Sequence, residues 1–257
     1  MPSNTDLSWV VHQGDSRHMA EVPDASVHLI VTSPPYNCGM PYDVHNDNMP
    51  FPEYLQLLQD VWTECKRVLV PGGRLCINVA NLGRRPYIPV APHVTMQLIS
   101  MGLLHRGEIV WDRGVTGKGA DSTTWGSWRS PSNPYLIDRH EYVLVFSKDR
   151  MDLTSNGESP DISKEQFMES VRSLWRISAE NAARIGHPVP FPIELARRLI
   201  RFYSFPKMVV LDPFCGSGTT GVAAKLLGRS FIGYDISENY CRKAQVRIDG
   251  VGGGDEY

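Results

Sequence analysis

The segment Val209–Gly221, VVLDPFCGSGTTG, has the residue types and spacing of an anion-binding turn. An apolar run leads into Asp212 and then into Gly216-Ser217-Gly218. Glycines let the backbone turn tightly, and the N-terminus of a helix beginning near Thr219 presents unpaired N–H groups to a carboxylate or phosphate. The third glycine of a dinucleotide fingerprint and the lysine of a P-loop are both missing, so a nicotinamide site and a P-loop are disfavoured.

A carboxylate follows this turn at the end of the next predicted strand. Asp235 closes the run Gly233-Tyr234-Asp235. An acidic residue in this position commonly accepts hydrogen bonds from ribose hydroxyls. The alternative is that Asp235 only caps a helix beginning at Ser237. We favour the ribose role because the glycine-rich turn and the carboxylate occur together.

A second segment, Thr32–Asn37 (TSPPYN), follows an apolar strand of its own. Pro34 and Pro35 fix the backbone and lack N–H donors, so their carbonyls remain as acceptors held in defined directions. Ser33 adds a side-chain oxygen and Tyr36 a flat ring. The set can accept hydrogen bonds from an amino group and stack on a ring, although a turn without function would have the same residues.

Apolar periodicity predicts strands that alternate with helices along most of the chain. Strands are expected at Val27–Thr32, Arg74–Ala80, Glu108–Asp112, Glu141–Ser147, Lys207–Leu211 and Ser230–Tyr234. Helices are expected at Glu53–Leu69, stopped by Pro71-Gly72-Gly73, and at His93–Met101, Pro192–Tyr203, Thr219–Leu227 and Ser237–Ile248. This order indicates an α/β fold with a mostly parallel sheet and helices on both faces. Ligands bind such sheets at the carboxyl ends of the strands, where both segments would lie.

The composition indicates one soluble domain over residues 1–257. The chain is 42% hydrophobic and 21% charged, and it has neither an apolar run of about 18 residues that could span a membrane nor a secretory signal. Five cysteines without a C-x-x-C pair disfavour a disulfide framework and a zinc site. We therefore expect a cytoplasmic protein without a metal.

Two polar stretches, 113–134 and 150–190, are long for loops in such a domain. The second holds one amphipathic piece near Glu165–Trp175. The net charge of the chain is −2, but Arg172–Lys207 holds seven basic residues against two acidic ones. That distribution fits a polyanionic partner as well as a solvated helix face. The glycine-rich tail, 250–257, is expected to be flexible.

Together, TSPPYN and DPFCGSGTTG resemble the catalytic and cofactor motifs of the DNA amino-methyltransferases, restriction-modification enzymes that methylate an exocyclic nitrogen of a base. The catalytic motif comes first in the chain, which is the permuted order of the β-group. The resemblance covers most of the chain. It extends to Gly14-Asp15-Ser16, Pro71-Gly72-Gly73-Arg74, His140-Glu141-Tyr142 and Gly186-His187-Pro188 with Phe191-Pro192.

The resemblance implies a Rossmann-like fold that binds S-adenosyl-L-methionine. It places Asp15 near the adenine, Asp235 on the ribose, and Thr219 and Thr220 on the methionine carboxylate. The residues implied for the cofactor are Asp15, Asp212, Phe214, Gly216, Ser217, Gly218, Thr219, Thr220 and Asp235.

The resemblance also implies that Ser33, Pro34, Pro35 and Tyr36 are the catalytic residues, and we call these four residues the catalytic segment. The Ser33 side chain and the Pro34 carbonyl would hold the target amine, and Tyr36 would stack on a base flipped out of duplex DNA. Serine in the first position is commoner in N4-cytosine enzymes, so we favour cytosine N4 over adenine N6. A C5-cytosine enzyme is disfavoured because Cys38 does not follow a proline. An enzyme acting on RNA or on a protein amide and a catalytically idle DNA-binding relative remain as alternatives.

Double-stranded DNA is the implied partner, and the two polar stretches are the expected site of target recognition. Basic and aromatic side chains of the first stretch can contact phosphates, base edges or the gap left by a flipped base, or the tryptophans can simply pack against the core. The candidate DNA-binding residues are Arg113, Lys118, Trp125, Trp128, Arg129, Arg172, Arg176 and Arg184. A cognate restriction endonuclease is a partner that the resemblance allows, and a monomer and a homodimer both remain open.

Overall fold

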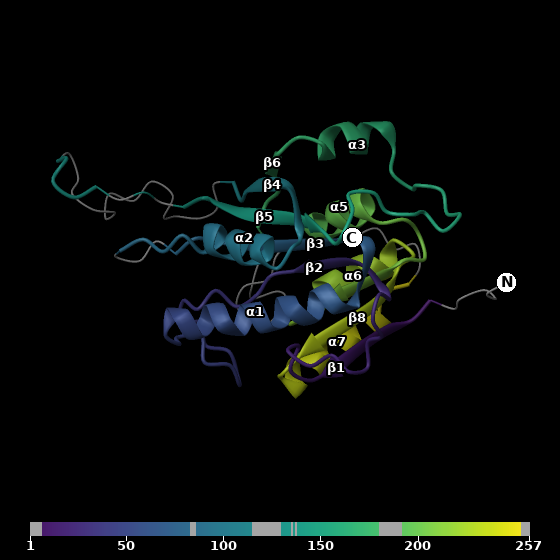
Figure 1. Ribbon diagram of the computed structural model, residues 1–257, viewed down its shortest axis with the longest axis horizontal. Helices are drawn as coiled ribbons and strands as arrows, with labels where there is room; N and C mark the ends of the chain where they lie inside the picture. Colours follow the sequence, from purple (N-terminus) through teal and green to yellow (C-terminus); the bar gives the residue numbers. More distant parts are fainter. Residues whose placement is uncertain are drawn as a thin grey trace.

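An eight-stranded sheet crosses the molecule from one end to the other (Figure 1). The computed structural model describes residues 7–82, 86–114, 130–134, 136, 138–179 and 192–252. The strand order is β1-β8-β7-β2-β3-β5-β4-β6. The strands are β1 (Trp9–Gln13), β2 (Val27–Thr32), β3 (Leu69–Val79), β4 (Leu104–Asp112), β5 (His140–Ser147), β6 (Leu174–Arg176), β7 (Val209–Asp212) and β8 (Ser230–Asp235).

Most neighbouring strands are parallel, as the alternation of strands and helices predicts. The exception is β5, which runs antiparallel to both β3 and β4. The central strand β2 pairs in parallel with β3 on one side and β7 on the other. Because β2 and β7 are parallel neighbours, their carboxyl ends lie side by side. The segment Thr32–Asn37, which follows β2, and the glycine-rich turn, which follows β7, therefore begin next to each other at the same edge of the sheet.

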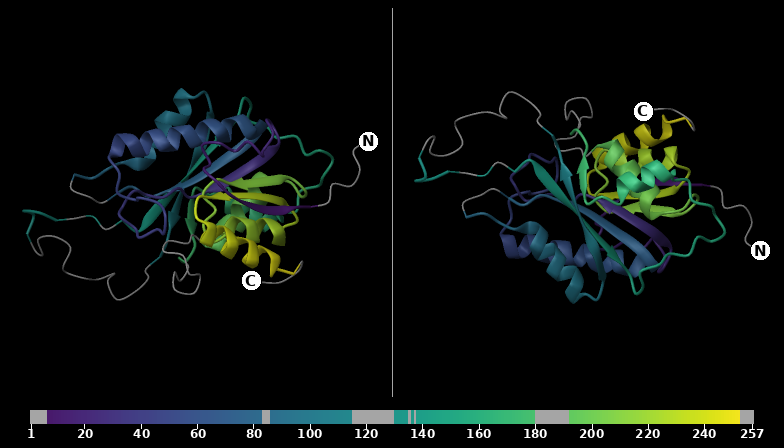
Figure 2. Two further views of the ribbon diagram at one scale, coloured as in Figure 1. Left: turned by 90° about the horizontal axis from the view of Figure 1, so that it is seen from below. Right: turned by 90° about the horizontal axis from the view of Figure 1, so that it is seen from above.

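Helices cover both faces of the sheet (Figure 2). Helices α1 and α2 lie over one face, and α5, α6 and α7 lie over the other. A further helix, α3, stands beside the β6 edge (Figure 1). The helices are α1 (Phe51–Val68), α2 (Val90–Ser100), α3 (Lys164–Ser170), α5 (Ile193–Tyr203), α6 (Thr219–Leu226) and α7 (Glu238–Asp249).

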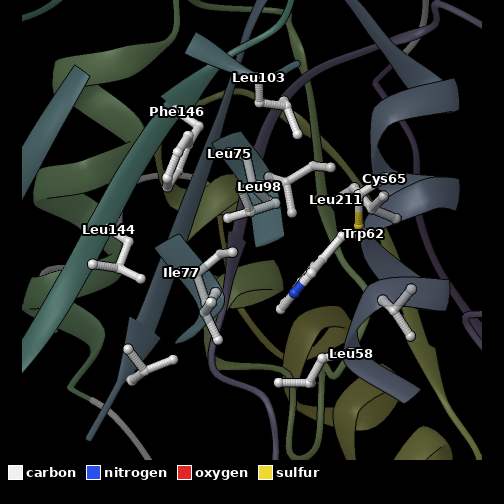
Figure 3. Close-up of a cluster of buried hydrophobic side chains, with 14 of the residues drawn as sticks. Leu58, Trp62, Cys65, Leu75, Ile77, Leu98, Leu103, Leu144, Phe146 and Leu211 are labelled. Atoms are coloured by element: carbon white, nitrogen blue, oxygen red, sulfur yellow. The ribbon is translucent and has the colours of Figure 1, made fainter. Parts of the chain in front are cut away.

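Each face of the sheet has its own apolar core, because alternate residues of a strand point to opposite faces. In β3, Leu75 and Ile77 join the core under α1 (Figure 3). Cys76, between them, joins the core on the other side of the sheet. Trp62 of α1 is fully buried in the first core and meets Phe214 edge to face, with ring centroids 6.3 Å apart. Truncating such a tryptophan costs about 3–5 kcal/mol, so α1 contributes to the stability of the Phe214 turn.

The predicted ranges hold for most elements, with three corrections. Pro71-Gly72-Gly73 does not stop the first helix: α1 ends at Val68 and β3 begins at Leu69 and runs through this segment. Between the pairs Val27–Leu69 and Leu29–Arg74, β3 has more residues than β2, and the pairing of the two strands shifts its register there. The stretch 150–190 contributes α3 and the edge strand β6, which pairs with β4. The first strand, β1, was not predicted, although it fastens the N-terminal segment to β8.

Two further observations concern the C-terminal tail and membrane-spanning helices. Val251 is buried in the second core, so the tail that we expected to be flexible from residue 250 is packed at its start. No helix in the described part of the chain is long and apolar enough to cross a membrane.

Candidate active site

Asp212 joins the catalytic segment to the glycine-rich turn. Its Oδ1 atom accepts hydrogen bonds from the Thr32 hydroxyl (2.6 Å) and the Phe214 amide (3.1 Å), and its Oδ2 atom accepts one from the Thr220 hydroxyl (2.7 Å). The carboxyl group is buried, and burial raises its pKa to about 6. The ends of β2 and β7 and the start of α6 are thereby held together through one side chain.

The glycine-rich turn depends on glycine at two positions. Gly216 and Gly218 have φ values of +48° and +80°, a region that side chains disfavour. Gly218 also forms the N-terminal boundary of α6, where a Cβ atom would lie 2.9 Å from the Cβ atom of Ala244 in α7. The turn is fixed from the same side by Arg247, which donates to the carbonyl of Ser217 (2.5 Å).

Asp235 faces this turn from the end of β8. Its Oδ2 atom accepts a hydrogen bond from the Gly216 amide (3.0 Å) and its Oδ1 atom accepts one from the Ser237 amide (2.8 Å). Burial raises the pKa of Asp235. The side chain of Ser237, not that of Asp235, caps α7 by accepting from the Tyr240 amide. The carboxylate remains partly accessible and lines the pocket described next.

A pocket of about 210 Å³ lies where these segments meet. Six of the residues proposed from the sequence line it: Asp15, Ser33, Pro35, Phe214, Gly216 and Asp235. Its remaining walls come from residues for which the sequence predicted no role in the site, namely Ser16, Arg17, Tyr42, Asp43, Val44, His45, Leu57, Val61, Pro213, Ile236 and Tyr240. The pocket thus combines carboxylates with apolar side chains from α1 and from the turn.

Other proposed residues lie behind the pocket wall rather than in it. Pro34, Tyr36, Asp212, Ser217, Gly218, Thr219 and Thr220 are not among the lining residues. The Thr220 hydroxyl donates its proton to Asp212, and the expected contact of Thr219 and Thr220 with the methionine carboxylate remains a prediction. Both carboxylate oxygens of Asp212 likewise accept hydrogen bonds from protein groups, and these bonds stabilise the glycine-rich turn.

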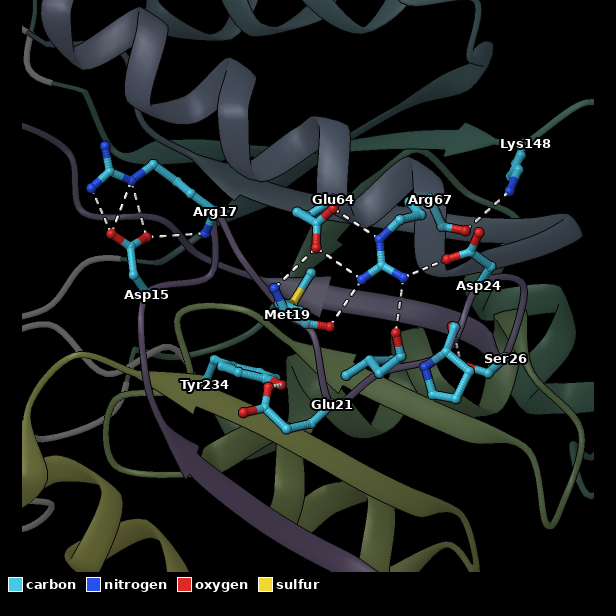
Figure 4. A network of polar contacts seen from close by, with 12 residues as sticks. Asp15, Arg17, Met19, Glu21, Asp24, Ser26, Glu64, Arg67, Lys148 and Tyr234 are labelled. Carbon is cyan, nitrogen blue, oxygen red and sulfur yellow. Dashed lines mark hydrogen bonds and ion pairs between the residues drawn. The ribbon is translucent and has the colours of Figure 1, made fainter.

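At the pocket mouth, Asp15 is paired with Arg17 (Figure 4). The Arg17 guanidinium and amide both donate to the Asp15 carboxylate, and this pairing lowers its pKa. The segment that follows is held onto α1 by Arg67, which bonds Glu64, Asp24 and the Met19 carbonyl (Figure 4). Arg17 therefore holds the Asp15 carboxylate, and contacts with α1 hold the segment that follows.

The catalytic segment is supported by a buried polar cluster that the sequence did not reveal. The Tyr36 hydroxyl lies 3.0 Å from Ser33 Oγ and donates to Glu141 Oε2 (2.8 Å). The Asn78 amide donates to Tyr36 (2.8 Å) and to Glu141 (2.6 Å), and Arg113 pairs with Glu141 at 3.2 Å. Burial and the charge of Glu141 raise the pKa of Tyr36 well above its usual value, so its hydroxyl stays protonated.

Ser33 and Pro35 thus line a pocket that also holds the Asp15 and Asp235 carboxylates, at one edge of the sheet. The model of the N6/N4 DNA methylase family matches residues 27–246. The chain belongs to this family of DNA methylases. It is a DNA amino-methyltransferase with a Rossmann-like fold, and its catalytic segment precedes its glycine-rich turn.

Relatives of this methylase cover most of its length. The Type II methyltransferase M.MjaI of Methanocaldococcus jannaschii is 31% identical over 88% of this chain and 86% of its own. The solved structure of TTHA0409 from Thermus thermophilus, complexed with S-adenosyl-L-methionine, is 31% identical and covers 93% of each chain with a TM-score of 0.75. The PvuII DNA methyltransferase (cytosine-N4-specific) is 20% identical and has the same fold, with a TM-score of 0.72 over 96% of this chain and 87% of its own.

One side of the methylase pocket is formed by the segment after Tyr36. The buried Asp47 carboxylate accepts hydrogen bonds from the amides of Asn37 (2.8 Å), Cys38 (3.0 Å) and Met40 (2.9 Å). These contacts turn the chain so that residues 42–45 line the pocket. No local signal in the sequence distinguishes Asp47 from other loop aspartates.

Only three of the eight candidate DNA-binding residues, Arg113, Arg172 and Arg176, lie among the residues that the structure describes. Lys118, Trp125, Trp128, Arg129 and Arg184 lie outside the described residues. Arg113 is directed at Glu141 and the Asp138 carbonyl. Arg172 is exposed, and Arg176 is exposed with Asp112 3.5 Å away.

The basic cluster Arg172–Lys207 is partly neutralised within the protein. Arg198 pairs with Glu169 (3.0 Å) and Glu194 (3.4 Å) and lies over the Trp175 ring. Lys207 pairs with Glu158 at 2.9 Å. The formal charge of this region therefore overstates the charge that is free to meet a polyanion.

Proposed function

We propose that this DNA amino-methyltransferase transfers a methyl group from S-adenosyl-L-methionine to the N4 amine of cytosine in duplex DNA. The observation that carries the proposal is that Ser33, of the amine-accepting segment, lines the same pocket as Asp235 and the glycine-rich turn. A group that can accept hydrogen bonds from an amine and a site for a ligand that bears a carboxylate and a ribose thus open onto one space.

The residues of the pocket fit the cofactor. Asp235 presents a carboxylate that uses one lone pair of each oxygen on a backbone amide and keeps others for ribose hydroxyls. Phe214, Leu57, Val61 and Ile236 supply apolar walls for an adenine ring. When bound there, S-adenosyl-L-methionine supplies an electrophilic methyl group.

The catalytic segment acts on the target amine. The lone pair of an exocyclic amine is delocalised into the ring, which makes the amine a poor nucleophile. Ser33 Oγ and the Pro34 carbonyl would accept its hydrogen bonds and draw the nitrogen toward tetrahedral geometry, which localises the lone pair. The contribution is one of positioning and electrostatics, with no covalent intermediate on the protein.

The choice of cytosine rests on the serine at position 33, the residue that the resemblance associates with N4-cytosine enzymes. The test is transfer of tritiated methyl from S-adenosyl-L-methionine to duplex DNA, with RNA and a protein mixture as controls, followed by nucleoside mass spectrometry. We expect N4-methylcytosine. N6-methyladenine would support the alternative base, label in RNA or protein would support the alternative substrates, and DNA binding without any label would indicate an idle relative.

A further inference from the structure

A buried carboxylate lies behind the catalytic segment and takes no direct part in the proposed reaction. Glu141 is 4% exposed and is not among the residues that line the pocket. Its Oε1 atom accepts from the Arg113 guanidinium (3.2 Å), and its Oε2 atom accepts from Asn78 Nδ2 (2.6 Å) and the Tyr36 hydroxyl (2.8 Å). A carboxylate paired with a guanidinium is ionised, and an ionised carboxylate can only accept hydrogen bonds.

This carboxylate determines the direction of the neighbouring hydrogen bonds. A tyrosine hydroxyl has one proton and two lone pairs. The proton of Tyr36 is donated to Glu141, because a bond between these two oxygens needs a proton and the carboxylate has none to give. The oxygen of Tyr36 therefore accepts from its other neighbours, Asn78 Nδ2 at 2.8 Å and Ser33 Oγ at 3.0 Å. In the pair formed by Ser33 and Tyr36, Ser33 must be the donor.

The orientation of Asn78 supports the same direction. If its amide were turned over, Oδ1 would lie against the Glu141 carboxylate, and two acceptors at 2.6 Å would repel each other. In the orientation observed, Oδ1 has no hydrogen-bond partner among the described residues. The amide thus directs its donors to Glu141 and Tyr36, with a longer contact of 3.5 Å to Ser33 Oγ, even though its own acceptor is left unpaired.

Ser33 consequently turns its lone pairs away from Tyr36, and Ser33 is the member of this cluster that lines the pocket. We propose that Glu141 is a positioning residue which, through Tyr36, keeps the Ser33 hydroxyl as a hydrogen-bond acceptor for the exocyclic amine of the target base. The proposal rests on the proposed function in its account of the amine. Its statement about hydrogen-bond direction concerns the protein alone.

The direction of the hydrogen bonds can be tested without any reaction. Neutron diffraction from deuterium-exchanged crystals of the full-length protein locates the deuterons on hydroxyl groups. We expect the Tyr36 deuteron to point at Glu141 and the Ser33 deuteron to point at Tyr36. A deuteron on Glu141, or a Tyr36 deuteron that points at Ser33, would overturn the proposal whether or not the protein methylates DNA.

The kinetic test compares E141Q, Y36F and the double variant by single-turnover methyl transfer to duplex DNA. A glutamine can donate to Tyr36, which frees the tyrosine proton to point at Ser33, and phenylalanine removes the hydroxyl but keeps the ring. We expect each single variant to lower the rate about 10- to 100-fold, the scale of one lost charge-assisted hydrogen bond, with cofactor affinity nearly unchanged. The double variant should be no slower than the slower single variant, because both changes break one chain of contacts.

The control is E108Q, which makes the same change at an exposed glutamate on β4, and it should match the wild type. Multiplied losses in the double variant would show that Glu141 acts independently of Tyr36. If E141Q does not fold, the rate of Y36F and the neutron structure still test whether Tyr36 keeps Ser33 as a hydrogen-bond acceptor for the amine. A wild-type protein that labels no nucleic acid would count against the proposed function, not against the hydrogen-bond direction.

Discussion

Two aspartates at neighbouring strand ends have different environments and therefore different roles. Asp212 is enclosed by two hydroxyls and an amide, whereas Asp235 keeps one side toward the pocket. Burial raises the pKa of both carboxyl groups. Changes at Asp212 should therefore alter folding, and changes at Asp235 should alter ligand binding.

The first prediction concerns Asp235. Replacing it by alanine should weaken binding of S-adenosyl-L-methionine by about 1–3 kcal/mol, roughly 5- to 150-fold, because a charge-assisted hydrogen bond to a ligand hydroxyl is lost. Isothermal titration calorimetry measures the change. Glu238→Ala, at an exposed acid in the first turn of α7, is the matched control and should bind normally. Unchanged affinity in a folded Asp235→Ala protein would reject the ribose role.

The second prediction concerns the pH dependence of stability at Asp212. Its folded pKa of about 6 lies above the value of about 3.9 expected in the unfolded chain, so the native state holds the proton more tightly. The free energy of unfolding should therefore fall as pH rises from about 4 to about 6, by on the order of 2–3 kcal/mol from this group. Asp212→Asn should lack that component.

Urea unfolding of wild type and Asp212→Asn at several pH values measures the difference. The stability of the variant relative to wild type should improve as pH rises through this window. Asp15→Asn offers a contrast, because pairing with Arg17 lowers the pKa of Asp15 and its contribution is lost as pH falls. Parallel pH profiles for wild type and Asp212→Asn would contradict the assigned pKa.

At the scale of elements, the site depends on how closely α6 approaches α7. Gly218 stands at this approach with a φ of +80°, and the Cβ atom of an alanine there would lie 2.9 Å from Ala244 Cβ. Two separate costs apply to such a substitution, one from the left-handed backbone and one from the contact.

A pair of glycine variants separates these costs and gives the third prediction. Gly157 has a φ of +87° with no atom within 4 Å of an added Cβ, so Gly157→Ala should lose only the backbone cost of about 1–2 kcal/mol. Gly218→Ala should lose about 1–3 kcal/mol more and should bind the cofactor less tightly, because α6 must shift. Denaturant unfolding measures both. Equal losses would show that the packing of α6 on α7 tolerates a methyl group.

The sequence predicted the positions of helices and strands along the chain better than it predicted which strands pair in the sheet. The apolar runs of β2 and α5 are local patterns, and both elements lie where they were expected. The antiparallel direction of β5 and the edge position of β6 depend on pairing partners far along the chain, which no local pattern encodes.

The same holds for the site. Four of the proposed residues that line the pocket, Ser33, Pro35, Phe214 and Gly216, come from the two motifs, because each motif is a short run of neighbouring positions. Glu141 meets Tyr36 across 105 positions of sequence, so its part in the cluster could not be inferred. The hydrogen bond from the Thr220 hydroxyl to Asp212 joins two residues of one motif, and the expected contact of Thr220 with the methionine carboxylate remains a prediction.

At the scale of the whole molecule, the charge that can meet DNA is smaller than the sequence count. Arg198 is only 13% exposed in its side chain and is held by two glutamates, whereas the Arg176 side chain is 80% exposed. We propose that Arg172, Arg176 and Arg184 contact phosphates and that Arg198 does not.

The fourth prediction tests this division by the salt dependence of DNA binding. Each phosphate contact contributes a slope of about −0.9 in log K against log salt, so neutralising the three arginines should flatten the slope by up to about 3. Arg198→Met should leave the slope unchanged and lower stability instead. An unaltered slope in the triple variant, with cofactor binding intact, would place the DNA elsewhere, with 113–129 as the next candidate.

The hydrogen bond between Thr32 and Asp212 joins residues that are 180 positions apart, and the indole of Trp9 reaches the Arg229 carbonyl across 220 positions. Ribosomal synthesis proceeds from the N-terminus, so β2 is made long before β7, its neighbour in the sheet. Until then the edge of β2 that pairs with β7 has no strand beside it, a situation that favours slow folding and association with other chains. The pocket is thus completed only after Tyr240 has been made, and a nascent chain stopped before residue 235 has Ser33 and Pro35 but lacks Asp235, Ile236 and Tyr240 of the same pocket.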